Sequence, residues 1–170
     1  MIIEEAISTP AERLIGRILD GDWRVLERVT LSSTATGGLF SVCYIVEKSN
    51  GTRGFLKALD FTKAIGQPDP AAAMKEVSDA FVFERTILDR CRDRQLDRIV
   101  LAISDGKTQV DGFGAFGVVQ YLIFELADRD VRAQLDYLGR FDLAWCLRSL
   151  HHVAVGLMQL HRHGNCAFGP

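Results

Sequence analysis

The chain lacks the features that mark several classes of protein. Its four cysteines include no Cys-x-x-Cys pair, so neither a zinc ribbon nor a disulfide framework is indicated. No apolar run approaches the ~20 residues needed to cross a bilayer. The first residues carry acids where a signal peptide would carry bases. We therefore expect a cytoplasmic protein with reduced thiols and no membrane partner.

An excess of basic charge is also missing. The chain has 20 Lys and Arg residues against 22 Asp and Glu residues, which gives a net charge of −2 at pH 7. Nucleic-acid binding needs a basic stripe to neutralise phosphates, so we expect no nucleic-acid partner. What is present is 48% hydrophobic residues in a chain of 170. This composition is typical of a globular protein that buries a core.

The central feature of the sequence is the stretch 53–60, which reads as a strand carrying Lys57 among apolar neighbours. Leaving an ammonium group unpaired in a site of low dielectric is costly. Lys57 is therefore expected to meet an anion. The alternative is a lysine whose stem packs on a sheet while its ammonium group reaches water.

The hydrophobic patterns predict an α+β chain. A helix is expected over residues 9–20, because Thr9 and Pro10 form a typical helix start. Alternating patterns predict five strands, at residues 23–31, 40–46, 53–60, 98–103 and 118–126. Helical spacing predicts two long helices, at residues 71–92 and 142–162, with a linker at 127–130.

This order of elements is similar to the first part of a Ser/Thr-type protein kinase domain. Val42 stands fifteen positions before Lys57, as the valine after the glycine-rich loop stands before the kinase lysine. The segment 83–88 resembles the kinase helix C around the glutamate that pairs with that lysine. The resemblance implies that Lys57 contacts the α and β phosphates of ATP and that Glu84 orients it. Glu76, two turns earlier, is the competing partner.

Two further segments extend the resemblance. Residues 121–127 resemble the hinge between the kinase lobes, which implies Phe124 as the gatekeeper and the backbone of Glu125 and Ala127 as contacts of adenine. Residues 150–164 resemble the helix that enters the catalytic loop.

The fold implied by the resemblance is a kinase-like amino-terminal lobe with a five-stranded antiparallel sheet and a helix C, followed by helices of an incomplete carboxy-terminal lobe. The implied boundaries divide the chain into three parts. Residues 1–21 are an amino-terminal helical extension, residues 22–126 are the kinase-like lobe, and residues 127–170 are the hinge and a truncated second lobe.

The glycine-rich loop of kinases is matched only in part. Of the three glycine positions counted back from Val42, one carries a glycine, Gly37, and Gly38 stands beside it. Phe40 occupies the last of the three. The implied role of Gly37 and Gly38 is to bring backbone amides towards phosphates. A flexible turn is the alternative.

No residue after Gly164 matches the catalytic Asp or the magnesium-binding Asn and Asp of kinases. We therefore expect a truncated and inactive chain without a catalytic residue or metal ligand of its own. Intact kinases transfer the γ-phosphoryl group of ATP to protein Ser or Thr. Here the implied cofactor is weakly bound ATP, and magnesium would enter only with ATP. The histidines of residues 151–163 form no His-Glu-x-x-His pattern, so no metal site is expected.

Two other functions stay open. A non-catalytic pseudokinase or scaffold would bind a protein partner, or a second copy of itself, through the helix 142–162. A chain without the larger kinase lobe would expose the apolar face of that helix. The third alternative is an α+β domain unrelated to kinases.

Overall fold

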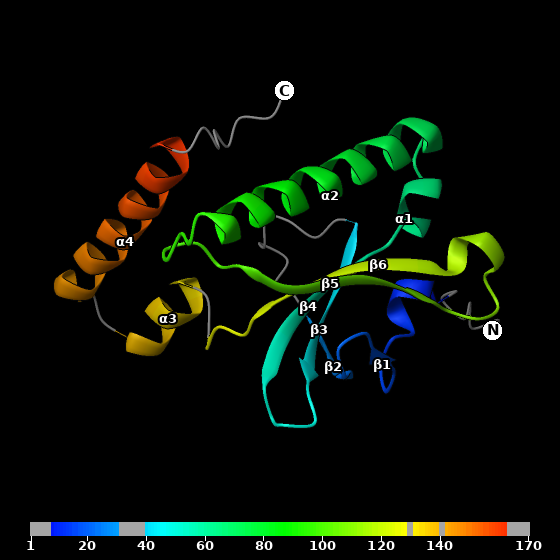
Figure 1. Cartoon of the computed structure of the whole chain (residues 1–170), viewed down its shortest axis with the longest axis horizontal. Helices are drawn as coiled ribbons and strands as arrows, with labels where there is room; N and C mark the ends of the chain where they lie inside the picture. The colour runs from blue at the N-terminus through cyan, green and yellow to red at the C-terminus, as the bar shows by residue number, and fades with distance from the viewer. Residues whose placement is uncertain (1–7, 31–39, 129–130, 140–141, 163–170) are drawn as a thin grey trace. The chain divides into compact units, whose positions relative to one another are not determined.

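The computed structural model describes residues 8–30, 40–128, 131–139 and 142–162. The chain divides into two compact units, residues 1–83 with 102–126 and residues 84–101 with 127–170. The first unit contains the sheet, and helices dominate the second (Figure 1). The elements, in chain order, are η1 (Pro10–Glu12), β1 (Ile18–Leu19), β2 (Trp23–Val29), β3 (Ser41–Glu47), β4 (Arg53–Leu59), α1 (Thr62–Ile65), α2 (Pro70–Asp93), β5 (Ala102–Gln109), η2 (Gly114–Gly117), β6 (Val118–Glu125), α3 (Val131–Leu138) and α4 (Leu143–Arg162).

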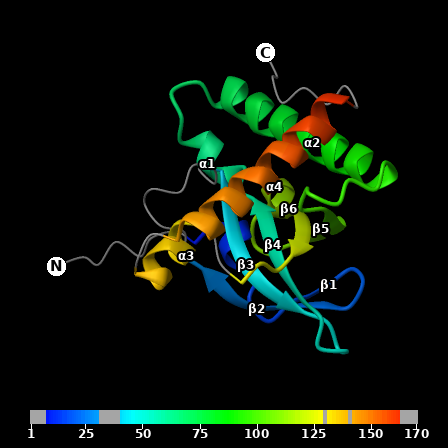
Figure 2. The same ribbon diagram turned by 90° about the vertical axis from the view of Figure 1, so that its left-hand side faces the viewer.

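The described strands form one antiparallel sheet of six strands, in the order β1-β2-β3-β4-β6-β5. Figure 2 shows β2, β3 and β4 side by side. The chain is α+β, but the expected kinase-like lobe with five strands and a helix C is wrong. The sixth strand, β1, lies in the stretch 9–20 that we expected to be helical. Gly16 interrupts that stretch with φ of +82°, a conformation outside the α-helix.

The core of the first unit lies on one face of this sheet, here called the inner face. Side chains alternate between the two faces along each strand, and the inner-face residues are buried over 23–25 of β2, 42–46 of β3, 54–58 of β4 and 119–123 of β6. The strand residues of this cluster are Leu19, Trp23, Val25, Val42, Tyr44, Val46, Leu56, Ala58, Val119, Tyr121 and Ile123. Fully burying a side chain such as leucine or valine contributes about 1.5–3 kcal/mol.

The amino-terminal segment covers the inner face. Ala11 of η1 and Leu14 beyond it are almost fully buried in the same cluster. The hydroxyl of Tyr44 donates a hydrogen bond to the carbonyl of Ala11, so the polar tip of this buried tyrosine is satisfied. The segment that was expected to form a separate helix is therefore part of the core.

The two edges of the sheet approach each other. Arg17, just before β1, donates a hydrogen bond from its guanidinium group to the carbonyl of Gln109, the last residue of β5, at 2.9 Å. Asp20, just after β1, also lies beside β5, because a Cβ added at Gly106 would stand 3.3 Å from its Oδ2. The sheet therefore curls until its first and last strands are neighbours, as strongly twisted sheets can do.

The opposite, outer face is covered near the end of β4. Leu59 packs with Ala64 of α1 and Val77 of α2, and Phe61 and Phe81 are partly buried against them. Figure 1 shows α1 between the end of β4 and the start of α2. This second cluster anchors the first half of α2 to the first unit.

Asp60 ends the Lys57 strand as a buried carboxylate. It accepts hydrogen bonds from the Thr9 hydroxyl at 2.9 Å and from the Thr62 amide at 3.2 Å, and a third from the Thr62 hydroxyl. A buried charge is stable only when it is paired or hydrogen-bonded. Asp60 therefore ties the amino-terminal segment to the start of α1.

The second unit contains α4 as its longest complete helix. Asp142 caps it, since its Oδ1 accepts a hydrogen bond from the Trp145 amide at 3.0 Å. Gly156 is buried, and a Cβ added there would lie 3.2 Å from the carbonyl oxygen of Arg98. Gln159, nearly one turn later, donates to Asp97 at 2.8 Å. One face of α4 therefore packs against residues 97–99.

Candidate functional site

Lys57 lies in the middle of β4, opposite Cys43 of β3 and Leu122 of β6. Its chain neighbours Leu56 and Ala58 both belong to the inner core. Because side chains alternate along a strand, Lys57 projects from the outer face. It is half-buried there.

Two lysines influence a buried thiol on the outer face. Burial raises the pKa of the Cys43 thiol, and the ammonium groups of Lys57 and Lys63 oppose that rise. Lys57 and Lys63 are therefore the cations of this end of the sheet that a negatively charged ligand could use.

A buried hydroxyl lies on the same face. Ser41, two residues before Cys43, has no hydrogen-bond partner of acceptable geometry for its Oγ among the described residues. It is close enough to the Cys43 thiol to favour the thiolate form, but a thiol is a weak hydrogen-bonding group. Buried hydroxyl groups usually have a partner, so Ser41 has unused capacity to bind a polar ligand.

Val42 and Lys57 do not share a face of the sheet. Val42 is buried in the inner cluster, and its partner across the ladder is Ala58. Lys57 is one residue away from Ala58 and therefore points to the outer face. The structure does not bring these two predicted site residues together.

Phe124 shares the outer face with Lys57. It lies two residues beyond Leu122, the partner of Lys57 on β6, which is a rise of about 7 Å along the strand. Glu125 is exposed at the end of β6 and pairs with Gly54. Ala127 is exposed and belongs to the second unit.

The remaining predicted site residues lie on α2 or outside the described residues. Glu84 is half-buried on α2, at the first residue of the second unit, whereas Lys57 belongs to the first unit. Their pairing stays a prediction, as does the competing role of Glu76, which is exposed on the earlier part of α2. Gly37 and Gly38 lie outside the described residues.

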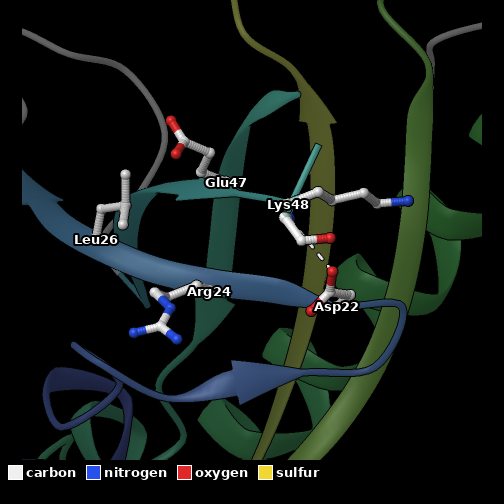
Figure 3. A pocket seen from close by; sticks show the side chains of 6 residues that line it. Asp22, Arg24, Leu26, Glu47 and Lys48 are labelled. Carbon is white, nitrogen blue, oxygen red and sulfur yellow. Dashed lines mark hydrogen bonds between the residues drawn. The ribbon is translucent and has the colours of Figure 1, made fainter. Parts of the chain in front are cut away.

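The strand ends of β2 and β3 form a second polar site, a small pocket (Figure 3). The residues that line it are Asp22, Arg24, Leu26, Glu47, Lys48 and Ser49. Asp22 accepts a hydrogen bond from the Ser49 amide at 3.2 Å, and hydrogen bonds from Ser49 hold the pKa of Asp22 below its ordinary value. The Lys48 ammonium lies 4.7 Å from the centre of the Trp23 ring. The bond between Asp22 and Ser49 therefore joins the start of β2 to the residues that follow β3.

Sequence reasoning missed Cys43, Ser41 and Lys63 as parts of the Lys57 site. The spacing between Cys43 and Lys57 contains no signal of their contact, because it depends on the register of β3 against β4. Ser41 could have been placed with Cys43 from the alternation along β3. Lys63 follows Lys57 by six residues but lies on α1, beyond the strand.

The described residues contain no group of three or more His, Cys, Asp or Glu side chains arranged to hold a metal ion. In the same part of the chain, every helix is too short or too polar to cross a membrane. Cys43, Cys91 and Cys146 are free thiols.

The chain was also compared with known proteins. No protein-family model matches it, and a comparison with curated proteins gave no match either. The likeness to kinases therefore stays a prediction from local segments of the sequence.

Proposed function

We propose that the chain binds the phosphates of an adenine nucleotide on the outer face of the sheet, around Lys57. The observation that carries this proposal is the position of Lys57, half-buried on the outer face of β4 opposite Cys43, with Lys63 on the helix α1 that follows the same strand. Phosphate oxygens form charge-assisted hydrogen bonds with such cations. Salt screens a partly buried pair much less than an exposed one.

Two further residues support the same face. The Ser41 hydroxyl can donate to a phosphate oxygen, and Phe124 offers an aromatic surface on which a base can pack. The choice of adenine rests on the likeness of residues 121–127 to the kinase hinge, as predicted from sequence. That likeness concerns local segments and not the sheet, which has six strands.

Within this proposal, magnesium enters only together with ATP, as its counter-ion. The proposal covers binding, and the phosphoryl transfer that kinases perform is not part of it. A cytoplasmic location is proposed as well, supported by the free thiols of Cys43, Cys91 and Cys146.

The test is isothermal titration of the purified chain with MgATP, comparing Lys57→Met with Lys107→Met. Lys107 is exposed on β5 of the same sheet, so its substitution makes the same change of charge outside the site. Lys57→Met is expected to weaken binding at least ~10-fold, equivalent to about 1.4 kcal/mol. Lys107→Met is expected to leave binding unchanged.

Lys63→Met extends the test to the second cation. It should weaken MgATP binding less than Lys57→Met does, and titration with adenosine should show no dependence on either lysine. The proposal is wrong if the unsubstituted chain releases no heat with millimolar MgATP. It is equally wrong if Lys57→Met and Lys107→Met weaken binding to the same extent.

A second candidate function is favoured by one observation on α4. Its apolar side chains are exposed to an unusual degree: Leu143 is 59% exposed, Leu147 57%, Leu150 66% and Leu157 45%. Contiguous exposed apolar surface marks protein contact sites. We propose that α4 is a contact surface for another protein chain.

A further inference from the structure

The buried carboxylate of Asp60 joins the amino-terminal segment to α1. Asp60 follows the last residue of β4 and is 1% exposed. Its Oδ1 accepts hydrogen bonds from the amide and the hydroxyl of Thr62, the first residue of α1. Its Oδ2 accepts a hydrogen bond from the Thr9 hydroxyl at 2.9 Å. The two oxygens of one carboxylate therefore bind two different parts of the chain.

The hydrogen bond from Thr9 also fixes how this carboxylate is oriented. The backbone of Asp60 is already held, because its amide donates to the carbonyl of Phe40 at 2.8 Å. Without Thr9, the Oδ2 atom would be buried without a donor, which is a costly state that the side chain relieves by turning towards water. Docking of the amino-terminal segment therefore keeps the Asp60 carboxylate in the orientation that holds Thr62.

The position of Lys63 depends on this anchor. Lys63 is the second residue of α1, which has only four residues. A helix of one turn has almost no stability of its own, so α1 relies on its contacts with the rest of the unit. These are the bonds of Thr62 to Asp60 and the packing of Ala64 in the outer apolar cluster. Lys63 is half-buried between these two contacts.

We propose that Asp60 is a positioning residue for the phosphate site, through which the docked amino-terminal segment holds Lys63 where it meets the phosphates. This inference rests on the proposed function and adds its regulation, because displacement of the segment at Thr9 weakens binding. Hydrogen bonds weaken steeply when the donor is out of line, so a small shift of α1 is sufficient. The Asp60 carboxylate is engaged by its three donors and acts only through Lys63.

The other contacts of the amino-terminal segment keep it folded when the Thr9 bond is removed. Ala11 and Leu14 are almost fully buried in the inner core. The Tyr44 hydroxyl donates to the carbonyl of Ala11. The Thr9 amide donates to the carboxylate of Glu12 at 3.1 Å, and this bond does not involve the Thr9 side chain. A substitution of that side chain therefore acts locally.

The experiment is isothermal titration of the full chain with MgATP, comparing Thr9→Val with Thr9→Ser. Valine has the shape of threonine without the hydroxyl and should weaken binding roughly 3- to 10-fold, which corresponds to the loss of one hydrogen bond. Serine keeps the hydroxyl and should bind as the unsubstituted chain does. The control is Thr108→Val, which makes the same change at a half-buried threonine of β5. It should leave binding unchanged.

A double-substitution cycle shows whether the effect passes through Lys63. In a chain that carries Lys63→Met, Thr9→Val should weaken MgATP binding no further, because the group that is positioned has been removed. Titration with adenosine, which has no phosphates, should show no difference between Thr9→Val and the unsubstituted chain. A general loosening of the unit would weaken the binding of adenosine and would add to the effect of Lys63→Met. Either of these results overturns the inference.

Hydrogen exchange without nucleotide separates failure of this inference from failure of the proposed function. Thr9→Val should raise the exchange of the amides of α1 while the centre of β4 stays protected. If exchange in α1 is unchanged, or if Thr9→Val and Thr108→Val bind MgATP alike, the inference is overturned and the proposed function is unaffected. If the unsubstituted chain releases no heat with millimolar MgATP, both are overturned.

Discussion

The inner face of the sheet is a buried apolar surface, and the exposed leucines of α4 are an apolar surface open to solvent. Leu56 on the inner face is fully buried, whereas Leu150 on α4 is 66% exposed. The inner face finds all its partners within the first unit, from the neighbouring strands and from the segment around Leu14. Apolar residues buried within one unit, such as Leu56, explain how that unit folds. The exposed leucines of α4 instead support the proposal that this helix contacts another chain.

Matched leucine substitutions give the largest expected effect and test the comparison directly. Leu56→Ala should lower the free energy of unfolding by about 2–5 kcal/mol, because it leaves a cavity in a closed core. Leu150→Ala should change that of the monomer by less than about 0.5 kcal/mol. Urea unfolding at low protein concentration measures both. Equal losses in the two variants would mean that Leu150 is part of a core after all.

A methyl group added to the inner sheet should have the next largest effect. A Cβ at Gly54 would lie 2.9 Å from Ile123 Cγ2 and 3.1 Å from the carbonyl oxygen of Phe124. Gly54→Ala should therefore cost about 1–3 kcal/mol. At Gly66 the nearest atom would be 3.8 Å away, so Gly66→Ala serves as the control and should change stability by less than about 0.5 kcal/mol. Chemical denaturation that ranks the two in reverse order would contradict the close packing at Gly54.

A smaller effect is expected where the sheet edges meet. Arg17→Met removes the hydrogen bond to the Gln109 carbonyl and should cost about 0.5–1 kcal/mol. Hydrogen exchange should rise in β1 and at the end of β5 while the centre of β4 stays protected. The control is Arg24→Met, an exposed arginine of β2. Faster exchange throughout the sheet would show that the bond does not act locally.

The smallest effect at neutral pH comes from the buried tyrosine of the inner face. Burial raises the pKa of Tyr44 to about 12, against about 10 in an unfolded chain. Between these values the unfolded state loses the proton first, so stability falls as the pH rises from about 10 to 12 and is unaffected below that range. Urea titrations across this range should show a shallower fall for Tyr44→Phe. Tyr137→Phe, which changes a tyrosine that is 72% exposed, should leave the slope as it is.

Most of the long elements could be predicted from the sequence. The strands expected at 23–31, 40–46, 53–60 and 118–126 and the two long helices are confirmed by β2, β3, β4, β6, α2 and α4. These segments have strong periodic patterns, which identify a helix or a strand without knowledge of what the element packs against.

The failures have separate physical causes. The helix expected at 9–20 is wrong because Gly16 has a φ angle of +82°, which an α-helix does not allow. Residues 18–19 then pair with β2 as the strand β1. The strand expected at 98–103 begins only at Ala102. Ile99 belongs to the second unit instead, where its side chain lies next to Gly156 of α4. Helix α3 has no counterpart among the expected helices, because the polar residues 127–130 predict a linker and the pattern of the last helix begins only at residue 142.

The candidate site was only partly predictable. The position of Lys57 within a strand followed from its apolar neighbours, but its surroundings depend on register. Val42 pairs with Ala58 rather than with Lys57, and a difference of one residue reverses the face. No local pattern carries that information.

The bond between Arg17 and Gln109 also affects how this chain can aggregate. An edge strand normally offers unpaired backbone groups on which a strand from another molecule can add. Here β1 is only two residues long, and the carbonyl at the end of β5 is occupied by a guanidinium group from the opposite edge. The short edge strand and this bond therefore leave less of the sheet edge open to a strand from another molecule.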